Sequence, residues 1–254
     1  MELKHQLTPH LKHLRLSGIL ETLDARHRLA VEGKWSYIEF LERLLQDEVE
    51  RRGQKQLTLR LRRATLTTTK TLESFDFGFN PTINRQQILA LAAGDYIREK
   101  RNVILCGPTG VGKSHLAQAL GHEACRRGYD VLLVNAYKLL QHLHGGRADD
   151  SLDRRLKLYL RPELLILDDF GLKPLQAPAP SDLYDIINER YERGSLLLTS
   201  NRPPAEWPGL FGDPLLAAAG IDRLCHRAEV IVIRGDSFRA QVRQRPELQE
   251  VSLN

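Results

Sequence analysis

The chain has 254 residues, 42% of them hydrophobic, and a formal net charge of +5 at pH 7; this fits one large domain or a medium domain with a small one, and suggests a polyanionic partner. Its three cysteines lie far apart without a C-x-x-C pair, which argues against a disulfide framework or a zinc site and favours a reducing compartment. The first residues lack the apolar core of a signal peptide and no apolar run approaches the roughly 18 residues of a membrane span, so we expect a cytoplasmic protein with no membrane partner.

Residues 1–72 contain little glycine or proline and predict a small helical domain that contacts DNA or other subunits. Apolar side chains recur at helical spacing, first at Leu11, Leu14, Ile19 and Leu23, then at Ile38, Leu41, Leu44, Leu45 and Val49. Ser36 and Glu39 have the spacing of a capping box at the start of the second pattern.

A basic run closes this region. Residues 51–70 contain seven lysines and arginines and no acidic residue. Read as a helix, the run places Leu57, Leu61 and Ala64 on an apolar stripe and most of its charges off it. Solvated helix faces usually mix both signs, so we favour contacts with DNA phosphates. A solvated face and a protein interface stay open as alternatives. The predicted DNA contacts here are Lys55, Arg60, Arg62 and Arg63.

Residues 73–84 break the helical pattern, and Gly78, Asn80 and Pro81 are typical of a linker. From residue 85 to residue 245, short apolar runs alternate with longer helical segments. The runs are NVILC, DVLLVNA, LLILDD, SLLLTSN and EVIVIRG. Apolar runs without strict alternation are typical of parallel strands buried on both faces, so we predict an α/β domain with a five-stranded parallel sheet. Residues 246–254 are too few for a further domain and are expected to form a tail.

The segment GPTGVGKS, from Gly107 to Ser114, matches the pattern G-x-x-x-x-G-K-[ST] of a phosphate-binding loop. A strand-like run precedes it and a helical segment follows it, as the motif requires. Its glycines let backbone N–H groups surround a phosphate, and the helix N-terminus adds a partial positive charge. Lys113 is expected at the β- and γ-phosphates and Ser114 on Mg²⁺. The expected nucleotide-binding residues are Gly107, Pro108, Thr109, Gly110, Val111, Gly112, Lys113, Ser114 and His115.

Acidic residues end the third apolar run. Its strand carries Asp168 to the tip, where a carboxylate can hold hydrated Mg²⁺ opposite Ser114. Asp169 follows and is expected to orient or deprotonate the attacking water. Two solvated acids after a core strand are the alternative interpretation.

The linker contains three alternating phenylalanines, Phe75, Phe77 and Phe79. They either fill the seam between two domains or help to form the adenine pocket.

Polar residues near the last two strands help to separate one class of phosphate-loop protein from another. Asn201 ends the fourth run and is expected to position the water near the γ-phosphate. Arg223 and Arg227 precede the fifth run, where an arginine could reach a neighbouring subunit's nucleotide. Arg239 follows that run and could face the γ-phosphate from within the same subunit. A plain strand-end turn and surface arginines are the alternatives.

A second basic segment, HGGRADDSLDRRLKLYLR, lies between the second and third runs. We predict phosphate contacts from Arg154, Arg155 and Lys157, with little sequence preference because nothing in the chain reads as a base-recognition module. A surface helix with ion pairs is the alternative, since three aspartates lie nearby, Asp149, Asp150 and Asp153.

The order of these motifs resembles the AAA+ ATPases. The segments FDFGFNPTINRQQILALAAGDYIREKRNVILCGPTGVGKSHLAQALGHEACRRGYDV and RLCHRAEVIVIRGDSFR are similar to the IstB family, the helper ATPases of insertion-sequence transposition. The likeness covers nearly the whole chain, and DnaC-type helicase loaders are close relatives of that family. A missing C-terminal lid domain is also typical of it. Many related ATPases carry Glu at the position of Asp169, which is one methylene shorter.

The resemblance implies an ATPase that uses ATP and Mg²⁺ and assembles as a homo-oligomer on double-stranded DNA, with nucleotide at subunit interfaces. It implies that Arg223 of one subunit completes the site of the next, and that the protein recruits and stimulates the transposase of the same element. Three alternatives stay open: a helicase loader that prefers single-stranded DNA, a small-molecule kinase, and a DNA-binding scaffold that binds ATP without hydrolysing it.

Overall fold

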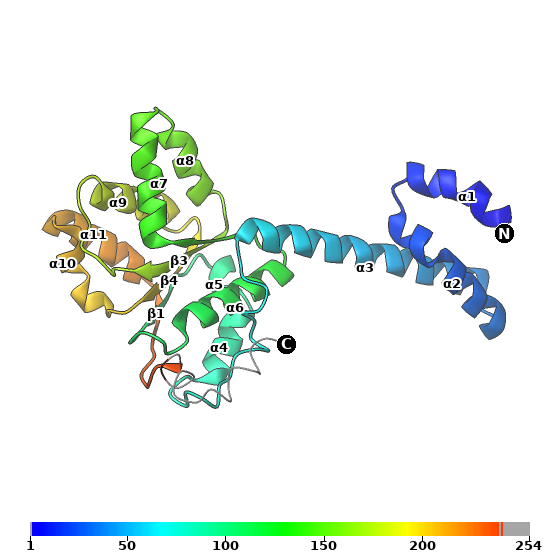
Figure 1. The fold of residues 1–254 in the computed structure, drawn as a ribbon, viewed down its shortest axis with the longest axis horizontal. Coiled ribbons are helices and arrows are strands. Elements are labelled where there is room, and N and C mark those ends of the chain that lie inside the picture. Colours follow the sequence, from blue (N-terminus) through cyan, green and yellow to red (C-terminus); the bar gives the residue numbers. More distant parts are fainter. Residues whose placement is uncertain (1, 239, 241–254) are drawn as a thin grey trace. The chain divides into compact units, whose positions relative to one another are not determined.

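The computed structural model describes residues 2–238 and residue 240 (Figure 1). The chain divides into two compact units, Met1–Leu59 and Arg60–Asn254, and the boundary falls inside the long helix α3 (Tyr37–Ala64). The domain boundaries expected at residues 72, 84 and 245 stay predictions. Within the described residues, no helix combines the length and the apolar character that crossing a bilayer requires.

The first unit is a group of helices joined by buried acidic side chains. It contains α1 (Glu2–His13), α2 (Ser17–Gly33) and the first part of α3. Glu48, buried on α3, accepts hydrogen bonds from the N–H groups of Gly18 at 2.6 Å and Ile19 at 3.4 Å. A carboxylate from one helix thereby satisfies free donors at the N-terminus of another. Gly18 is required at this crossing because a Cβ there would lie 2.8 Å from the Cα of Glu48.

The second unit contains the predicted five-stranded parallel sheet, which is confirmed. Its strands are β1 (Val103–Cys106), β2 (Val131–Asn135), β3 (Leu164–Phe170), β4 (Ser195–Ser200) and β5 (Glu229–Val232). They lie in the order β2-β3-β4-β1-β5, and every neighbouring pair is parallel. All residues of β1 and β4 are buried, as their uninterrupted apolar runs predict.

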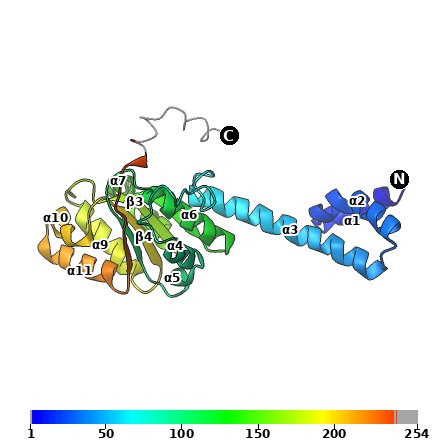
Figure 2. The ribbon, with the colours of Figure 1, turned by 90° about the horizontal axis from the view of Figure 1, so that it is seen from below.

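Helices cover both faces of this sheet. Figure 2 shows α4 (Arg85–Ala92), α5 (Asp95–Arg98) and α6 (Lys113–Arg126) on one side of the strands. On the other side lie α9 (Ala179–Arg190), α10 (Pro208–Phe211) and α11 (Pro214–Cys225). The remaining elements are α7 (Ala136–Ala148), α8 (Leu152–Leu160) and the 3₁₀ turn Pro204–Glu206. Among the described residues, no lid domain follows β5.

The segment after α3 is fixed to the second unit, to which it belongs. Ala64 is fully buried, and the hydroxyl of Thr65 donates to the carbonyl of Leu133 in β2 at 2.6 Å. The N–H of Thr67 donates to the buried side chain of Gln118 at 3.1 Å, and its carbonyl lies 2.9 Å from Nε2 of His122. Because Gln118 and His122 lie on α6, this segment is tied to the helix that follows the phosphate loop.

A buried arginine bonds to the backbone at the amino-terminal ends of β3 and β4. Arg190, at the end of α9, is 1% exposed. Its guanidinium donates to five backbone carbonyls, those of Tyr159, Leu160, Pro162, Glu163 and Ser195. Burial lowers the pKa of Arg190 to about 10, so the group stays charged at neutral pH. One side chain thus connects the end of α8 and the start of β3 to the start of β4.

We expect Arg190→Met to lower the free energy of unfolding by about 3 kcal/mol or more, because several carbonyls would be left buried without a donor. The measurement is urea unfolding followed by circular dichroism. Arg193→Met is the matched control: its side chain is 75% exposed and its ion pair within the described residues is with Glu189, so its expected cost is below about 1 kcal/mol. Equal effects of the two substitutions would contradict the assigned role of Arg190.

Candidate functional site

The phosphate loop lies between β1 and α6, at the carboxyl-terminal edge of the sheet. Gly107 has φ +148° and a Cβ at this position would overlap the carbonyl oxygen of Ile233. Gly112 has φ +100°, and a Cβ there would lie 2.8 Å from the ring of Phe75. Both positions therefore require glycine for steric as well as conformational reasons.

Strand β4 and the segment after β5 hold the loop in place. The N–H of Gly107 donates to the carbonyl of Ser200 at 3.1 Å, and the N–H of Phe238 donates to the carbonyl of Gly110 at 3.1 Å. The ammonium of Lys113 lies 2.8 Å from the carbonyl of Gly107 and 2.7 Å from that of Pro108. Only 6% of Lys113 is exposed, and its positive charge lies beside the loop. The loop can therefore accept an anion such as a phosphate group.

Two hydroxyl groups converge on one carboxylate beside the loop. The Oγ of Ser114, at the start of α6, donates to Oδ1 of Asp168 at 2.8 Å. The Oγ1 of Thr199, on β4, donates to the same oxygen at 2.5 Å. A carboxylate and a hydroxyl this close are suitable oxygen ligands for Mg²⁺, which prefers few protein ligands and keeps several waters. The residues present thus fit the predicted metal site of Ser114 and Asp168.

Asp169 occupies a special backbone position. The pairing of β3 with β4 shifts register between Leu167 and Phe170, and Asp169 has φ +58°. Its N–H donates to Oγ1 of Thr199 at 3.0 Å, and its Oδ2 accepts from Nδ2 of Asn135 at 3.2 Å. The local irregularity therefore takes Asp169 out of the regular ladder and brings its carboxylate against the end of β2.

Thr199 and Asn135 also belong to this site, although neither is among the site residues expected from the sequence. Asn135 ends β2 and also accepts from the N–H groups of Tyr137 and Lys138, so that it caps α7. The available signal was a polar residue at the carboxyl end of a buried strand, the same signal that selected Asn201. Asn201 lies against the loop, with its Nδ2 donating to Oγ1 of Thr109 at 3.2 Å.

The linker phenylalanines lie beside the phosphate loop. Phe75 packs edge-on against His115, with ring centres 5.1 Å apart, and against Phe77 at 4.8 Å. Nε2 of His115 lies 3.1 Å from the carbonyl of Thr71, and burial lowers the pKa of this histidine. Phe79 packs against Phe238, which bonds to the loop, with ring centres 4.9 Å apart. An apolar wall therefore adjoins the loop.

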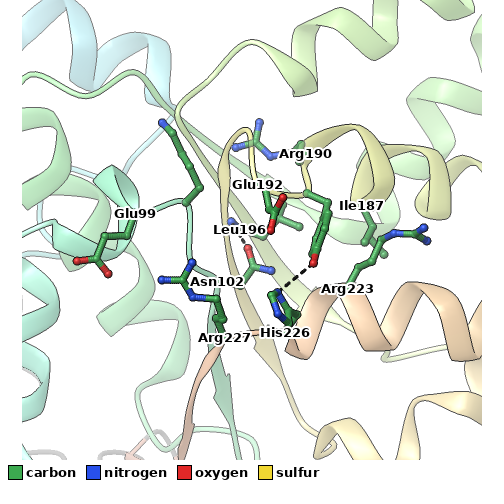
Figure 3. Close-up of a pocket in the computed structure, with 11 residues that line it drawn as sticks. Glu99, Asn102, Ile187, Arg190, Glu192, Leu196, Arg223, His226 and Arg227 are labelled. Atoms are coloured by element: carbon green, nitrogen blue, oxygen red, sulfur yellow. Dashed lines mark hydrogen bonds between the residues drawn. The ribbon is translucent and has the colours of Figure 1, made fainter.

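The candidate interface arginines lie near the amino-terminal ends of the strands, opposite the phosphate loop (Figure 3). The pocket drawn there includes Asn102 at the start of β1 and Leu196 at the start of β4, together with Arg223 and Arg227. The side chain of Asn102 bonds to both Leu196 and the carbonyl of Leu224, which fixes this edge. Because the strands run away from this pocket towards the phosphate loop, these arginines face away from the loop of their own chain. Arg239 lies outside the described residues.

The basic residues of the predicted DNA contacts fall into two groups. Lys55, Arg62, Arg63, Arg154 and Lys157 have exposed side chains, and that of Arg60 is half-exposed. Arg155 differs, since it donates to Asp149 at 2.7 Å, to Ser151 at 2.8 Å and to the carbonyl of His142 at 2.6 Å. Arg155 thus holds the connection between α7 and α8. A contact of Arg155 with DNA stays a prediction. The hypothesis of DNA binding rests mainly on the exposed residues.

A parallel sheet in the order β2-β3-β4-β1-β5, with a phosphate loop after β1 and paired acids at the end of β3, defines a P-loop nucleotide-binding domain of the AAA+ type. Within that class, the sequence pattern of one family matches residues 9–246. The chain belongs to this family, the IstB-like ATP binding proteins.

Relatives in the family cover nearly the whole chain. A Mycobacterium tuberculosis protein, named as an ATP-binding protein in an insertion sequence, is 44% identical over 234 residues, 92% of this chain and 93% of its own. A Sinorhizobium fredii protein with a similar name is 42% identical over 250 residues, 97% of this chain and 99% of its own. The ATP-binding protein of insertion sequence IS21 from Pseudomonas aeruginosa is 36% identical over 241 residues, 95% of this chain and 91% of its own.

Solved structures show the same fold. The DnaC helicase loader superposes with a TM-score of 0.57 at 21% identity, over 65% of this chain and 97% of its own. DnaA from Aquifex aeolicus bound to AMPPCP gives a TM-score of 0.55 at 24% identity, over 74% of this chain and 57% of its own. This likeness confirms the predicted AAA+ architecture.

We expect Thr199→Val to lower the free energy of unfolding by about 1–3 kcal/mol and to weaken binding of Mg²⁺–nucleotide. The substitution preserves shape but leaves the N–H of Asp169 without its acceptor and removes one donor from Asp168. Urea unfolding and titration with a fluorescent nucleotide measure the two effects. Thr68→Val, at an exposed position in the segment after α3, is the control. Wild-type behaviour of Thr199→Val would show that the hydroxyl does not organise the site.

Proposed function

We propose that this protein is an ATP-hydrolysing helper of insertion-sequence transposition. It binds ATP with Mg²⁺ between the subunits of a homo-oligomer on double-stranded DNA, and it recruits and stimulates the transposase of the same element. The observation that carries the proposal is that the hydrolytic residues gather at one edge of the sheet while Arg223 and Arg227 lie at the other. A chain arranged in this way needs a neighbour to complete its site.

Each residue of the loop edge has a role in hydrolysis under this proposal. Lys113 binds the β- and γ-phosphates, while Ser114 and Asp168 hold Mg²⁺, which neutralises charge on the phosphates. Asp169 accepts the proton of the attacking water, and Asn201 orients that water. Asn135, at the end of β2, supports this proton transfer because it holds the carboxylate of Asp169.

The adenine lies against the apolar wall of Phe75, Phe77 and Phe79. Two contacts support this placement: Phe75 touches the loop at Gly112, and Phe79 packs on Phe238, whose N–H bonds to Gly110. The alternative, in which these rings fill a seam between domains, has less support because most ring contacts described for them are with the loop region and with each other. Phe77 also lies against the guanidinium of Arg85 on α4, 5.6 Å from the ring centre.

Arg223 supplies positive charge to the γ-phosphate of the neighbouring subunit. An arginine in this role typically contributes a factor of about 10³–10⁵ in rate. A head-to-tail interface that closes into a ring, or continues as a helix, gives every subunit the same arrangement.

A mixing experiment tests this interface. Lys113→Ala removes the phosphate-binding lysine but leaves Arg223, and Arg223→Ala does the reverse. Each variant alone is expected to lose ATP hydrolysis on DNA by about 10³-fold. Mixed in equal amounts, they form wild-type sites at roughly one quarter of the interfaces, so hydrolysis returns. If each variant still assembles on DNA but the mixture stays inactive, Arg223 does not act across an interface.

DNA binding rests on the exposed cations Arg62 and Arg63 of the second unit and on Arg154 and Lys157 of α8. None of the four makes an ion pair with the part of the chain that the structure describes. By contrast, Arg51 and Arg52 in the same basic run pair with Glu21 and Glu48. Cations without a carboxylate partner release counterions when they meet phosphates, which favours a polyanion.

The double substitution Arg62→Ala, Arg63→Ala is expected to weaken ATP-dependent duplex binding. It should also reduce the slope of log affinity against log salt by about 1.8 per subunit, since each phosphate contact contributes about 0.9. Fluorescence anisotropy over a salt series measures both, with duplex and single strands compared. The control is Arg98→Ala, Arg193→Ala, which removes two exposed cations that are paired with acids. An unchanged slope would exclude these contacts, and a preference for single strands would favour a helicase loader.

A further inference from the structure

Arg223 is held by a single aromatic side chain of its own subunit. Its Nη1 donates to the hydroxyl of Tyr184 at 2.7 Å. Its guanidinium carbon also lies 5.3 Å from the centre of the Tyr184 ring, within the range of a cation–π contact. Both side chains are half-buried. One tyrosine therefore provides both a hydrogen-bond acceptor and a flat face for the same guanidinium.

Helix packing fixes Tyr184 in turn. Ile187, one turn further along α9, is 2% exposed and faces Gly220 of α11, where a Cβ would lie 3.7 Å from its Cδ1. Arg223 lies one turn beyond Gly220. The contact that sets Ile187 against Gly220 therefore also sets Tyr184 beside Arg223. The α9–α11 interface therefore fixes where the backbone of Tyr184 lies relative to Arg223.

Arg227 has a different orientation. Figure 3 shows the side chains of Arg223 and Arg227 directed to different sides of the pocket. Arg227 also follows the end of α11 and has φ +53°, outside the helix that packs on α9. The two guanidinium groups thus do not converge on one point in this structure. The contact with Tyr184 singles out Arg223.

We propose that Tyr184 is the positioning residue for the interface arginine. It orients the guanidinium of Arg223 towards the γ-phosphate held by the next subunit; this inference rests on the proposed function, in which Arg223 acts across an interface. A free arginine samples many rotamers, and ordering it during the reaction would slow hydrolysis. The hydrogen bond to Tyr184 uses one of five N–H donors, so the others stay available to a phosphate.

The test places Tyr184 substitutions in only one partner of the mixing experiment. Tyr184→Leu is added to the Lys113→Ala chain, which donates Arg223, and this chain is mixed with Arg223→Ala on duplex DNA. We expect kcat for ATP hydrolysis to fall about tenfold, because both contacts with the guanidinium are lost. Tyr184→Phe keeps the ring and should lower kcat about threefold. KM for ATP should change little in both cases, since the arginine acts on the transition state.

The same Tyr184→Leu substitution placed in the Arg223→Ala chain is the matched control, because that chain has no arginine to orient, and it should leave the rate unchanged. Tyr191→Phe in the donor chain is a second control, since Tyr191 bonds to His226 at 3.1 Å and not to Arg223.

Equal losses from both placements of Tyr184→Leu would show a general structural role and overturn the proposal. An active mixture that is indifferent to Tyr184 in the donor chain would overturn it as well, while leaving the interface arginine in place. A mixture of Lys113→Ala and Arg223→Ala with no activity would instead refute the proposed function on which the inference rests.

Discussion

The carboxylate of Asp168 joins three elements of the candidate site. It accepts hydrogen bonds from Ser114 at the start of α6 and from Thr199 on β4, so one oxygen atom connects a helix and two strands. That convergence requires β3, β4 and β1 to lie side by side and parallel, because only then do their carboxyl ends meet at one edge. The buried apolar runs of these strands set the spacing of the residues proposed to act in hydrolysis, so core packing and the proposed chemistry are coupled.

The same parallel arrangement separates the two halves of the proposed site. Every strand carries its carboxyl end to the phosphate loop, so the segments that precede the strands gather at the opposite edge. Arg223 precedes β5 and Arg190 precedes β4, and both therefore lie away from the loop. A chain of this topology offers its nucleotide residues on one edge and its arginine on the other. In the proposed homo-oligomer, head-to-tail association brings them together.

Much of the fold and part of the site could be predicted from the sequence. The five strands follow from apolar runs, and the loop follows from a motif with fixed positions. Asn135 and Thr199 were missed because their importance depends on register: Asn135 pairs with Asp168 across β2 and β3, which spacing along the chain does not reveal. Tyr184 could not be found for a similar reason, since it meets Arg223 only through the packing of α9 on α11. DNA contact by Arg155 stays a prediction; the sequence indicates Asp149 as a nearby acid, whereas the bonds of Arg155 to Ser151 and to the carbonyl of His142 depend on the packing of α7 and α8.

Asp169 shows how backbone geometry can explain a residue choice. The resemblance to AAA+ ATPases leads us to expect Glu at this position, and a shorter side chain could be expected to weaken the site. In this structure Asp169 has φ +58°, a conformation that Asp and Asn adopt more readily than other residues with a Cβ. The irregular pairing after Leu167 turns the backbone itself, and Asn135 and Thr199 hold the carboxylate and the N–H of the resulting turn. The position of this acid is therefore determined chiefly by the main chain. Asp, which tolerates a positive φ, is therefore favoured at this position over Glu, whose extra methylene would only lengthen the side chain.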